Sequence, residues 1–301
     1  MASNSEELTA YVNEIELCYA LDGPEAGDPL LLIMGLGAQL IGWPIEFVEQ
    51  LATNGFRVIR FDNRDSGLST KTLGEVPDAL DLLGKTLNGE PVKSIYSLSD
   101  MADDAVELLA FLGYKSAHIV GASMGGMIAQ TLAINHPQCA RSLTSISSAT
   151  GDPQLFTPTE EALNAIIGSP PETREEIIQA NILGSRALAG SLWDEDYATD
   201  QAKKNYHRNH FPEGVGFQLG AIAMSGDRTS ELQGLRLPTL VIHGAIDPLL
   251  PLHCGVATAD AIPNSEILIF EDMGHDLPSI YWPKVAQHIG NLASRTSYKE
   301  N

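Results

Sequence analysis

The sequence predicts an α/β protein with a mostly parallel central sheet, helices on both faces and a helical segment inserted late in the chain. Short apolar runs, typical of strands buried on both faces, alternate with helical runs over residues 1–150 and again over 232–301. Residues 151–231 contain helical patterns and Pro- and Gly-rich loops, but no strand of that kind. We therefore expect a core in two parts, 1–150 and 232–301, and a helical cap at 151–231.

The expected elements follow the chain in order. Strands are assigned to short apolar or alternating runs, and helices to runs with apolar residues three and four positions apart. An early antiparallel strand is expected at 10–20, where apolar and polar residues alternate. The later strands are expected at 29–34, 56–61, 117–120, 142–147, 238–243 and 266–270. Core helices are expected at 44–53, 99–113, 127–133 and 282–293, and cap helices at 159–167, 173–188, 196–209 and 215–224.

The segment 71–97 is long for a plain connection between a strand and a helix. Residues 77–87 within it have the pattern of a short helix. Connections of this length are usually functional lids or poorly ordered segments. The sequence does not decide between these two interpretations for the segment 71–97.

The charge balance excludes two classes of partner. Eighteen basic and 39 acidic residues give a formal net charge of -21. Such a surface repels nucleic acid phosphates and anionic membranes, so neither is an expected partner. Hydrophobic residues make up 44% of the chain, which is enough to bury a sizeable core. A homo-oligomer is compatible with this composition.

The cysteines and the N-terminus point to a reducing compartment. Cys18, Cys139 and Cys254 lie far apart and form neither a metal-ligand spacing nor a disulfide framework. The N-terminus is polar and acidic, without the basic and apolar regions of a signal peptide. No run approaches the ~18 apolar residues of a membrane span. The expected location is the cytoplasm.

A serine in a tight turn is the strongest functional signal in the sequence. The strand at 117–120 ends in Gly121-Ala122-Ser123-Met124-Gly125, which fits the G-x-S-x-G motif and leads directly into a helical run. Strand, serine and helix are the context that a nucleophile elbow requires. The glycines two positions on either side of Ser123 fit a turn in which the backbones approach closely. The alternative is a glycine-rich turn without chemistry.

A nucleophilic serine needs a base, and the base needs an orienting acid. His275 directly follows the last core strand, and Asp247 follows the strand before it. The carboxyl ends of parallel strands collect ligand sites, and the chain order Ser123, Asp247, His275 is the order expected for an elbow hydrolase. Asp247 also precedes Pro248, so a plain turn residue is its alternative role.

Other titratable residues have simpler expected roles. Asp272 and Asp276 are expected to be solvated loop carboxylates, and Arg64 to stabilise the turn after its strand rather than to bind an anion. His118 is expected to be a core histidine, and His243 to support the Asp247 loop. His207 and His210 are expected at the cap surface. The cap aromatic residues could line a substrate pocket or pack within the cap: Trp193, Tyr197, Tyr206, Phe211 and Phe217.

Acyl transfer also needs donors for the oxyanion. The residue after the nucleophile, Met124, offers one backbone N–H. We expect the second from Leu36, since Gly35 and Gly37 beside it would let the chain approach a substrate carbonyl. The alternative is that these glycines only permit a tight turn.

Taken together, these motifs resemble the α/β-hydrolase superfamily, and within it the aclacinomycin methylesterase type of serine esterase. The stretches that carry the resemblance span most of the core: M-G at 34–35, G-W-P at 42–44, R-F-D-N-R-D-S-G at 60–67, G-A-S-M-G at 121–125, D-P at 247–248 and G-H-D-L-P-S at 274–279. It implies an α/β-hydrolase fold, a triad of Ser123, Asp247 and His275, and oxyanion donors at Leu36 and Met124. The segment 71–97 is longer than the family's usual loop, and residues 151–230 match no family motif, so the family's tetracyclic substrate is not carried over.

The resulting expectation is a carboxylesterase-type serine hydrolase acting through an acyl-enzyme on small or medium lipophilic esters, methyl esters included. No metal or organic cofactor is implied, and the expected partner is the small-molecule ester. Two alternatives stay open. One is another reaction on the same triad, namely hydrolysis of a C–C bond, lactone or amide, or perhydrolysis. The other is a ligand-binding homologue without turnover. Haloalkane dehalogenases and epoxide hydrolases are disfavoured because they need Asp in place of Ser123.

Overall fold

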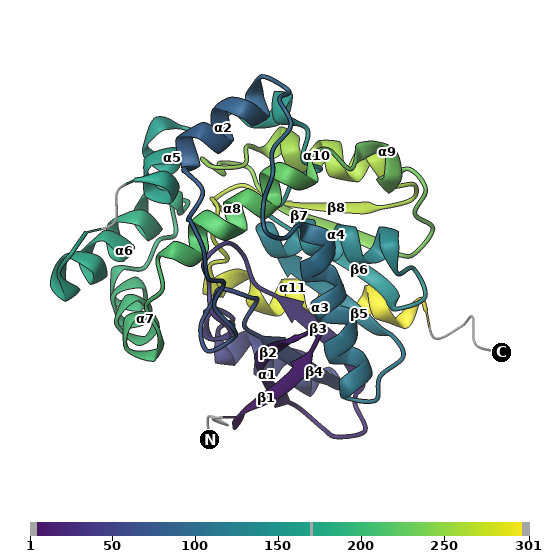
Figure 1. Ribbon diagram of the computed structural model, residues 1–301. Coiled ribbons are helices and arrows are strands. Elements are labelled where there is room, and N and C mark those ends of the chain that lie inside the picture. Colours follow the sequence, from purple (N-terminus) through teal and green to yellow (C-terminus); the bar gives the residue numbers. More distant parts are fainter. Residues whose placement is uncertain (1–4, 169–170, 297–301) are drawn as a thin grey trace.

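The computed structural model describes residues 5–168 and 171–296, and these contain one eight-stranded sheet (Figure 1). The strand order is β1-β2-β4-β3-β5-β6-β7-β8. β1 is antiparallel to β2 and β2 to β4, whereas β4, β3 and β5 to β8 are parallel. The strands are β1 (Glu7–Val12), β2 (Ile15–Asp22), β3 (Asp28–Ile33), β4 (Phe56–Phe61), β5 (Ala117–Ala122), β6 (Ala140–Ile146), β7 (Thr239–Gly244) and β8 (Glu266–Phe270).

The N-terminal region corrects one prediction. The single strand expected at 10–20 is wrong, because the chain forms a hairpin of β1 and β2 that starts earlier and pairs Val12 with Ile15. The two turn residues, Asn13 and Glu14, have φ values of 47° and 64°. Left-handed angles at both positions match the twist of the flanking strands, so a two-residue turn closes the hairpin.

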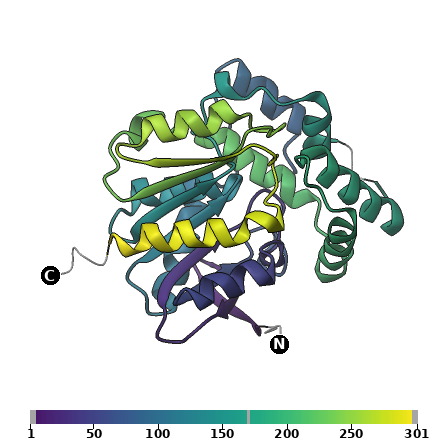
Figure 2. The same cartoon turned by 180° about the vertical axis from the view of Figure 1, so that it is seen from behind.

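Helices cover both faces of the sheet and complete the predicted α/β architecture. On one face, α1 (Ile45–Thr53) and α11 (Trp282–Ser294) share a hydrophobic core with the strands; α11 crosses the sheet in Figure 2. On the other face, α3 (Leu98–Phe111), α4 (Met124–Asn135) and α10 (Leu252–Ala261) share a second core. The sequence had not predicted α10 or the short α9 (Thr229–Leu232).

Between β6 and β7 the chain leaves the sheet, and before the short α9 its described residues form four helices: α5 (Glu160–Ile167), α6 (Arg174–Leu188), α7 (Glu195–Arg208) and α8 (Glu213–Ser225). Thr159, Thr173 and Asp194 cap the first three by accepting a backbone N–H in the first turn. The 71–97 segment contributes α2 (Ala79–Leu87), which lies beside these helices at the top of Figure 1. Short 3₁₀ helices occur at Leu40–Gly42, Pro153–Leu155 and Ser279–Tyr281.

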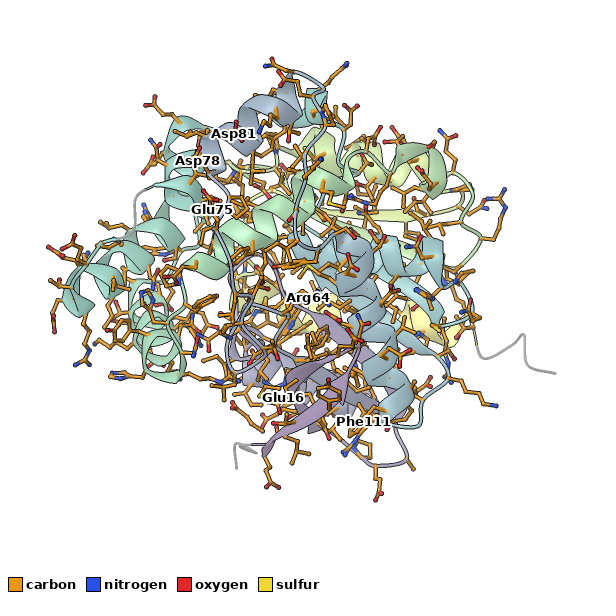
Figure 3. The ribbon with its side chains drawn as sticks, viewed as in Figure 1. Glu16, Arg64, Glu75, Asp78, Asp81 and Phe111 are labelled. Carbon is orange, nitrogen blue, oxygen red and sulfur yellow. The ribbon has the colours of Figure 1, made fainter. Side chains whose placement is uncertain are left out.

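Ion pairs, some of them buried, connect these parts. Arg208, at the end of α7, donates to Glu7 on β1 and to Asp62 after β4. Asp62 is fully buried, and its carboxylate also accepts the backbone N–H of Leu40. Arg64, visible at the centre of Figure 3, makes two 2.7 Å hydrogen bonds to Asp104 on α3. Arg64 thus has the structural role expected for it.

Candidate active site

Ser123 lies between the end of β5 and the start of α4, in a strained turn. Its φ and ψ are 55° and −122°, a conformation that non-glycine residues rarely adopt. The turn depends on its glycines: a Cβ at Gly121 would overlap the carbonyl oxygen of Gly125, and a Cβ at Gly125 would overlap that of Ile33. Ser123 does not cap α4 with its side chain, so its hydroxyl is available to other groups.

The structure brings the three predicted side chains together. Ser123 Oγ lies 2.9 Å from Nε2 of His275, and Nδ1 of His275 lies 2.7 Å from Oδ2 of Asp247. An ionised carboxylate only accepts hydrogen bonds, so the Nδ1 proton points at Asp247. Nε2 then carries a lone pair that can accept the hydroxyl proton of Ser123. This arrangement can deliver a serine alkoxide to an electrophilic carbon.

The Asp247 carboxylate is held from its other side by the backbone. Its Oδ1 accepts the N–H groups of Leu249 and Leu250, both at 2.9 Å. His243, at the end of β7, lies 3.7 Å from Oδ2 and bonds the carbonyl of Leu250 at 2.7 Å through Nε2. Burial lowers the pKa of His243, so this ring is neutral and supports the Asp247 loop, as expected.

The loop that carries His275 is clamped against the end of α6. The backbone N–H of His275 donates to the carbonyl of Leu188 at 2.7 Å. Asp276 accepts the backbone N–H groups of Gly190 and Gly274 at 3.2 and 2.9 Å. Burial raises the pKa of Asp276, so the prediction that it is a solvated carboxylate is wrong. The reason is a long-range contact with residues some 85 positions earlier; Asp272 is exposed, as expected.

The two residues predicted to donate a backbone N–H to an oxyanion lie at the same cavity as Ser123. Leu36 and Met124 both line the same cavity as Ser123, and a Cβ placed on Gly35 would be 3.7 Å from Ser123 Oγ. Within the described chain, neither N–H has a hydrogen-bond acceptor. Met124 also begins α4, where the positive end of the helix dipole favours negative charge. The local geometry can therefore accept a developing oxyanion.

The cavity next to Ser123 has a volume of about 180 Å³ and an almost entirely apolar lining. Most of its walls come from five parts of the chain: α2, α5, α8 and the segments around residues 149–156 and 249–254. Of the described lining residues, none is Lys, Arg or His, and Asp152 is the one with a charge. The aromatic lining residue is Phe156.

The sequence identified the polar residues but not the walls. Five residues of α2 line the cavity, and only the length of the 71–97 segment pointed to such a role. None of the five cap aromatic residues appears in the lining; Phe217 is buried, and Tyr197 packs edge-on against Trp282.

The other histidines with an expected role lie where they were expected. His118 is fully buried and forms hydrogen bonds with Ser142 at 2.8 Å and with Asp28 at 3.1 Å, as a satisfied core histidine. His207 and His210 are exposed.

Two kinds of feature are absent from the described residues. No group of three or more His, Cys, Asp or Glu side chains in this part of the chain gathers as it would around a metal ion. None of the described helices combines the length and the apolar character needed to cross a membrane.

The fold and the serine turn define the class of protein. A family model described as the alpha/beta hydrolase fold matches residues 28–278, so the chain belongs to the α/β-hydrolase family. It is 27% identical to the rhodomycin D methylesterase of Streptomyces sp. strain C5, over 85% of this chain and 87% of that protein. This agrees with the resemblance to the methylesterase type. It is also 28% identical to the 2-hydroxymuconate semialdehyde hydrolase of Pseudomonas sp. strain CF600, over 97% and 93% of the two chains.

Solved structures agree with the fold. The meta-cleavage product hydrolase of Pseudomonas fluorescens IP01 superposes with a TM-score of 0.72 at 20% identity, covering 98% of both chains. A thermophilic esterase from Thermogutta terrifontis superposes with a TM-score of 0.70 at 24% identity, covering 97% of this chain and 99% of that one.

Proposed function

We propose that the protein is a serine carboxylic ester hydrolase in which Ser123, His275 and Asp247 form the catalytic triad. The observation that carries the proposal is the continuous pair of hydrogen bonds, 2.9 Å from Ser123 to His275 and 2.7 Å from His275 to Asp247. In this proposal, residues 1–150 and 232–301 form the catalytic core and 151–231 the cap.

The first half of the reaction forms an acyl-enzyme. Ser123 Oγ attacks the ester carbonyl carbon while His275 Nε2 takes its proton, and the N–H groups of Leu36 and Met124 bind the oxyanion. Asp247 stabilises the imidazolium that forms and keeps the ring oriented. His275 then gives its proton to the leaving alkoxide, so the alcohol departs and the acyl group stays on Ser123.

The second half regenerates the enzyme. A water molecule enters where the alcohol left, and His275 takes a proton from it as it attacks the acyl carbon. The same two N–H groups bind the second oxyanion. When this intermediate collapses, His275 returns the proton to Ser123 Oγ and the carboxylic acid leaves.

The charge of the cavity favours neutral esters over the substrates of the C–C bond hydrolases that the chain resembles. A muconate-derived substrate carries a carboxylate, which needs a cationic or hydrogen-bonding partner when it is buried. The described lining of the cavity offers no Lys, Arg or His, and Asp152 would repel an anion. A neutral ester has no charge that needs a buried partner or that Asp152 would repel.

The experiment that tests the proposal combines active-site labelling with a substrate panel. A fluorophosphonate probe should label the folded protein at Ser123, and the Ser123→Ala variant should remain unlabelled. The wild type should hydrolyse p-nitrophenyl butyrate and methyl esters of aromatic acids faster than a dienoate C–C substrate, a lactone or an amide. Absence of labelling in folded protein would instead indicate a ligand-binding homologue, and faster C–C cleavage would overturn the ester assignment.

A further inference from the structure

The helix α2 separates two kinds of side chain. Residues at positions 79, 82, 83, 86 and 87 line the cavity, and this spacing places them on one face of a helix. The other face meets solvent: Leu80 is 65% exposed, and Asp81 is exposed. Figure 3 labels Glu75, Asp78 and Asp81 along the segment that leads into α2 and along the helix itself. α2 is thus a wall with a charged outer side and an apolar inner side.

Both ends of the segment that carries α2 rest on α8. Gly216 and Gly220 are one turn apart on that helix, and each allows a close approach. A Cβ on Gly216 would overlap the side chain of Val76, before α2, and a Cβ on Gly220 would lie 2.7 Å from Ser94 Oγ, after α2. With its two ends seated on the same helix, α2 has a defined position over the cavity.

The cavity that α2 closes is small. Its volume is about 180 Å³. An apolar cavity of ~150 Å³ in another protein holds one benzene molecule, so this one has room for about one aromatic ring or an aliphatic chain of similar bulk. With α2 in this position, a tetracyclic ring system would have to extend beyond this cavity.

The inner face of α2 also offers no free polar group. The hydroxyl of Thr86 donates to the carbonyl of Leu82 within the helix at 2.8 Å. Across the cavity, Asp152 accepts the backbone N–H of Gln154 at 2.9 Å. A polar or charged group placed against the inner face of α2 would lose its hydration without gaining a partner from that helix, and such a loss is costly.

We propose that α2 is the specificity wall of the site, and that Ala79 and Leu83 limit the ester substituent held beside Ser123 to a neutral apolar group about the size of one aromatic ring. The proposal rests on the ester hydrolase function proposed above. Ala79 and Leu83 are one turn apart on the inner face, so their bulk sets how far the substituent extends toward α2.

Three variants of α2 test the wall. Leu83→Ala enlarges the cavity, and Ala79→Leu fills part of it. Leu80→Ala is the matched control, because it also replaces Leu with Ala but on the outer face of α2. The assay measures kcat/KM for p-nitrophenyl esters from acetate to decanoate, with a second series that varies the alcohol. Because one methylene in an apolar pocket changes kcat/KM by about tenfold or more, Leu83→Ala should raise the octanoate-to-butyrate ratio at least about tenfold in whichever series occupies the cavity.

Ala79→Leu should lower the same ratio, and Leu80→Ala should leave it within about twofold of wild type. Equal profiles for Leu83→Ala and Leu80→Ala, in variants whose circular dichroism and melting temperature show a folded protein, would overturn the proposal. So would a wild-type preference for charged acyl groups.

A binding measurement separates failure of the wall from failure of the proposed function. In the Ser123→Ala background, calorimetry with p-nitrophenyl butyrate and p-nitrophenyl octanoate should show octanoate binding strengthened by Leu83→Ala and not by Leu80→Ala. Suppose that this binding result is obtained but the wild type neither hydrolyses esters nor reacts with fluorophosphonate. The role proposed for α2 would then be supported, and the proposed ester hydrolase function would be refuted. Normal hydrolysis with no size effect in either assay would refute the wall alone.

Discussion

Replacing Asp247 with Asn should leave the protein folded and reverse the hydrogen-bonding direction at His275. Oδ1 of Asp247 accepts two backbone N–H groups, from Leu249 and Leu250, at 2.9 Å each. In the Asn variant, the N–H groups of Leu249 and Leu250 require the amide oxygen at the position of Oδ1. An NH₂ group at that position would leave both N–H groups without an acceptor. The NH₂ must then face His275 Nδ1 at the position of Oδ2, 2.7 Å away.

This geometry sets the magnitude of the effect. An NH₂ facing Nδ1 makes that nitrogen the acceptor, so the ring proton moves to Nε2 and points at Ser123. His275 then cannot accept the serine proton. The same substitution in a chymotrypsin-type triad lowers kcat by about 10⁴, which corresponds to about 5 kcal/mol of transition-state stabilisation. We expect a loss of this order in kcat for p-nitrophenyl butyrate, with KM little changed.

The matched control is Asp272→Asn, which makes the same change at an exposed carboxylate in the loop that leads to His275. It should keep kcat within about twofold of wild type. Melting temperatures by circular dichroism verify that both variants are folded. If Asp247→Asn retained more than about a tenth of wild-type kcat, the assignment of Asp247 as the orienting acid would be refuted.

Three further predictions follow from contacts described above. Gly125→Ala places a methyl group against the carbonyl oxygen of Ile33, so the elbow must shift and kcat/KM for p-nitrophenyl butyrate should fall about 100-fold; unchanged kinetics would contradict the crowding. Asp276→Ala removes the acceptor of two backbone N–H groups and should lower the free energy of unfolding, measured in urea, by about 2 kcal/mol or more, whereas Asp276→Asn should recover most of it. Burial lowers the pKa of His118 and of His243 below the ordinary 6.5, so only the unfolded chain takes up these protons as the pH falls. Urea unfolding should therefore show stability decreasing below about pH 6.5, by up to ~1.4 kcal/mol per pH unit for each histidine, and a flat profile would contradict this.

Local signals were sufficient for most of the sheet and for the serine turn. β4 was predicted at its observed bounds because its residues, F-R-V-I-R-F, are mostly aromatic or β-branched and are followed directly by a polar turn. The turn at Ser123 was predictable because G-x-S-x-G, placed between a strand and a helix, indicates a turn in which Gly121 and Gly125 approach closely; the approach of Gly125 to Ile33 on β3 is a long-range contact. The pairing of Ser123 with His275 was predictable because topology places the ends of parallel strands at one edge of the sheet.

Features that depend on distant contacts were not predictable in the same way. The hairpin turn at Asn13 and Glu14 lacks the glycine that usually marks such turns. α10 is rich in small residues and has no clear apolar stripe, so its pattern did not distinguish it from a loop. The solvated role expected for Asp276 was wrong because one of its partners, Gly190, comes from the segment just after α6. The inner face of α2 became a wall only because α5, α8 and distant loops line the same cavity.

The positions of the three triad residues along the chain have a consequence for biosynthesis. Ser123 emerges from the ribosome long before Asp247 and His275, and His275 follows β8, which is the last of the described strands along the chain and lies at an edge of the sheet. A nascent chain, or one truncated before β8, would present the hydroxyl without its base. Under the proposed function, the appearance of turnover therefore reports that the final strand has docked, and it offers a simple readout for refolding experiments.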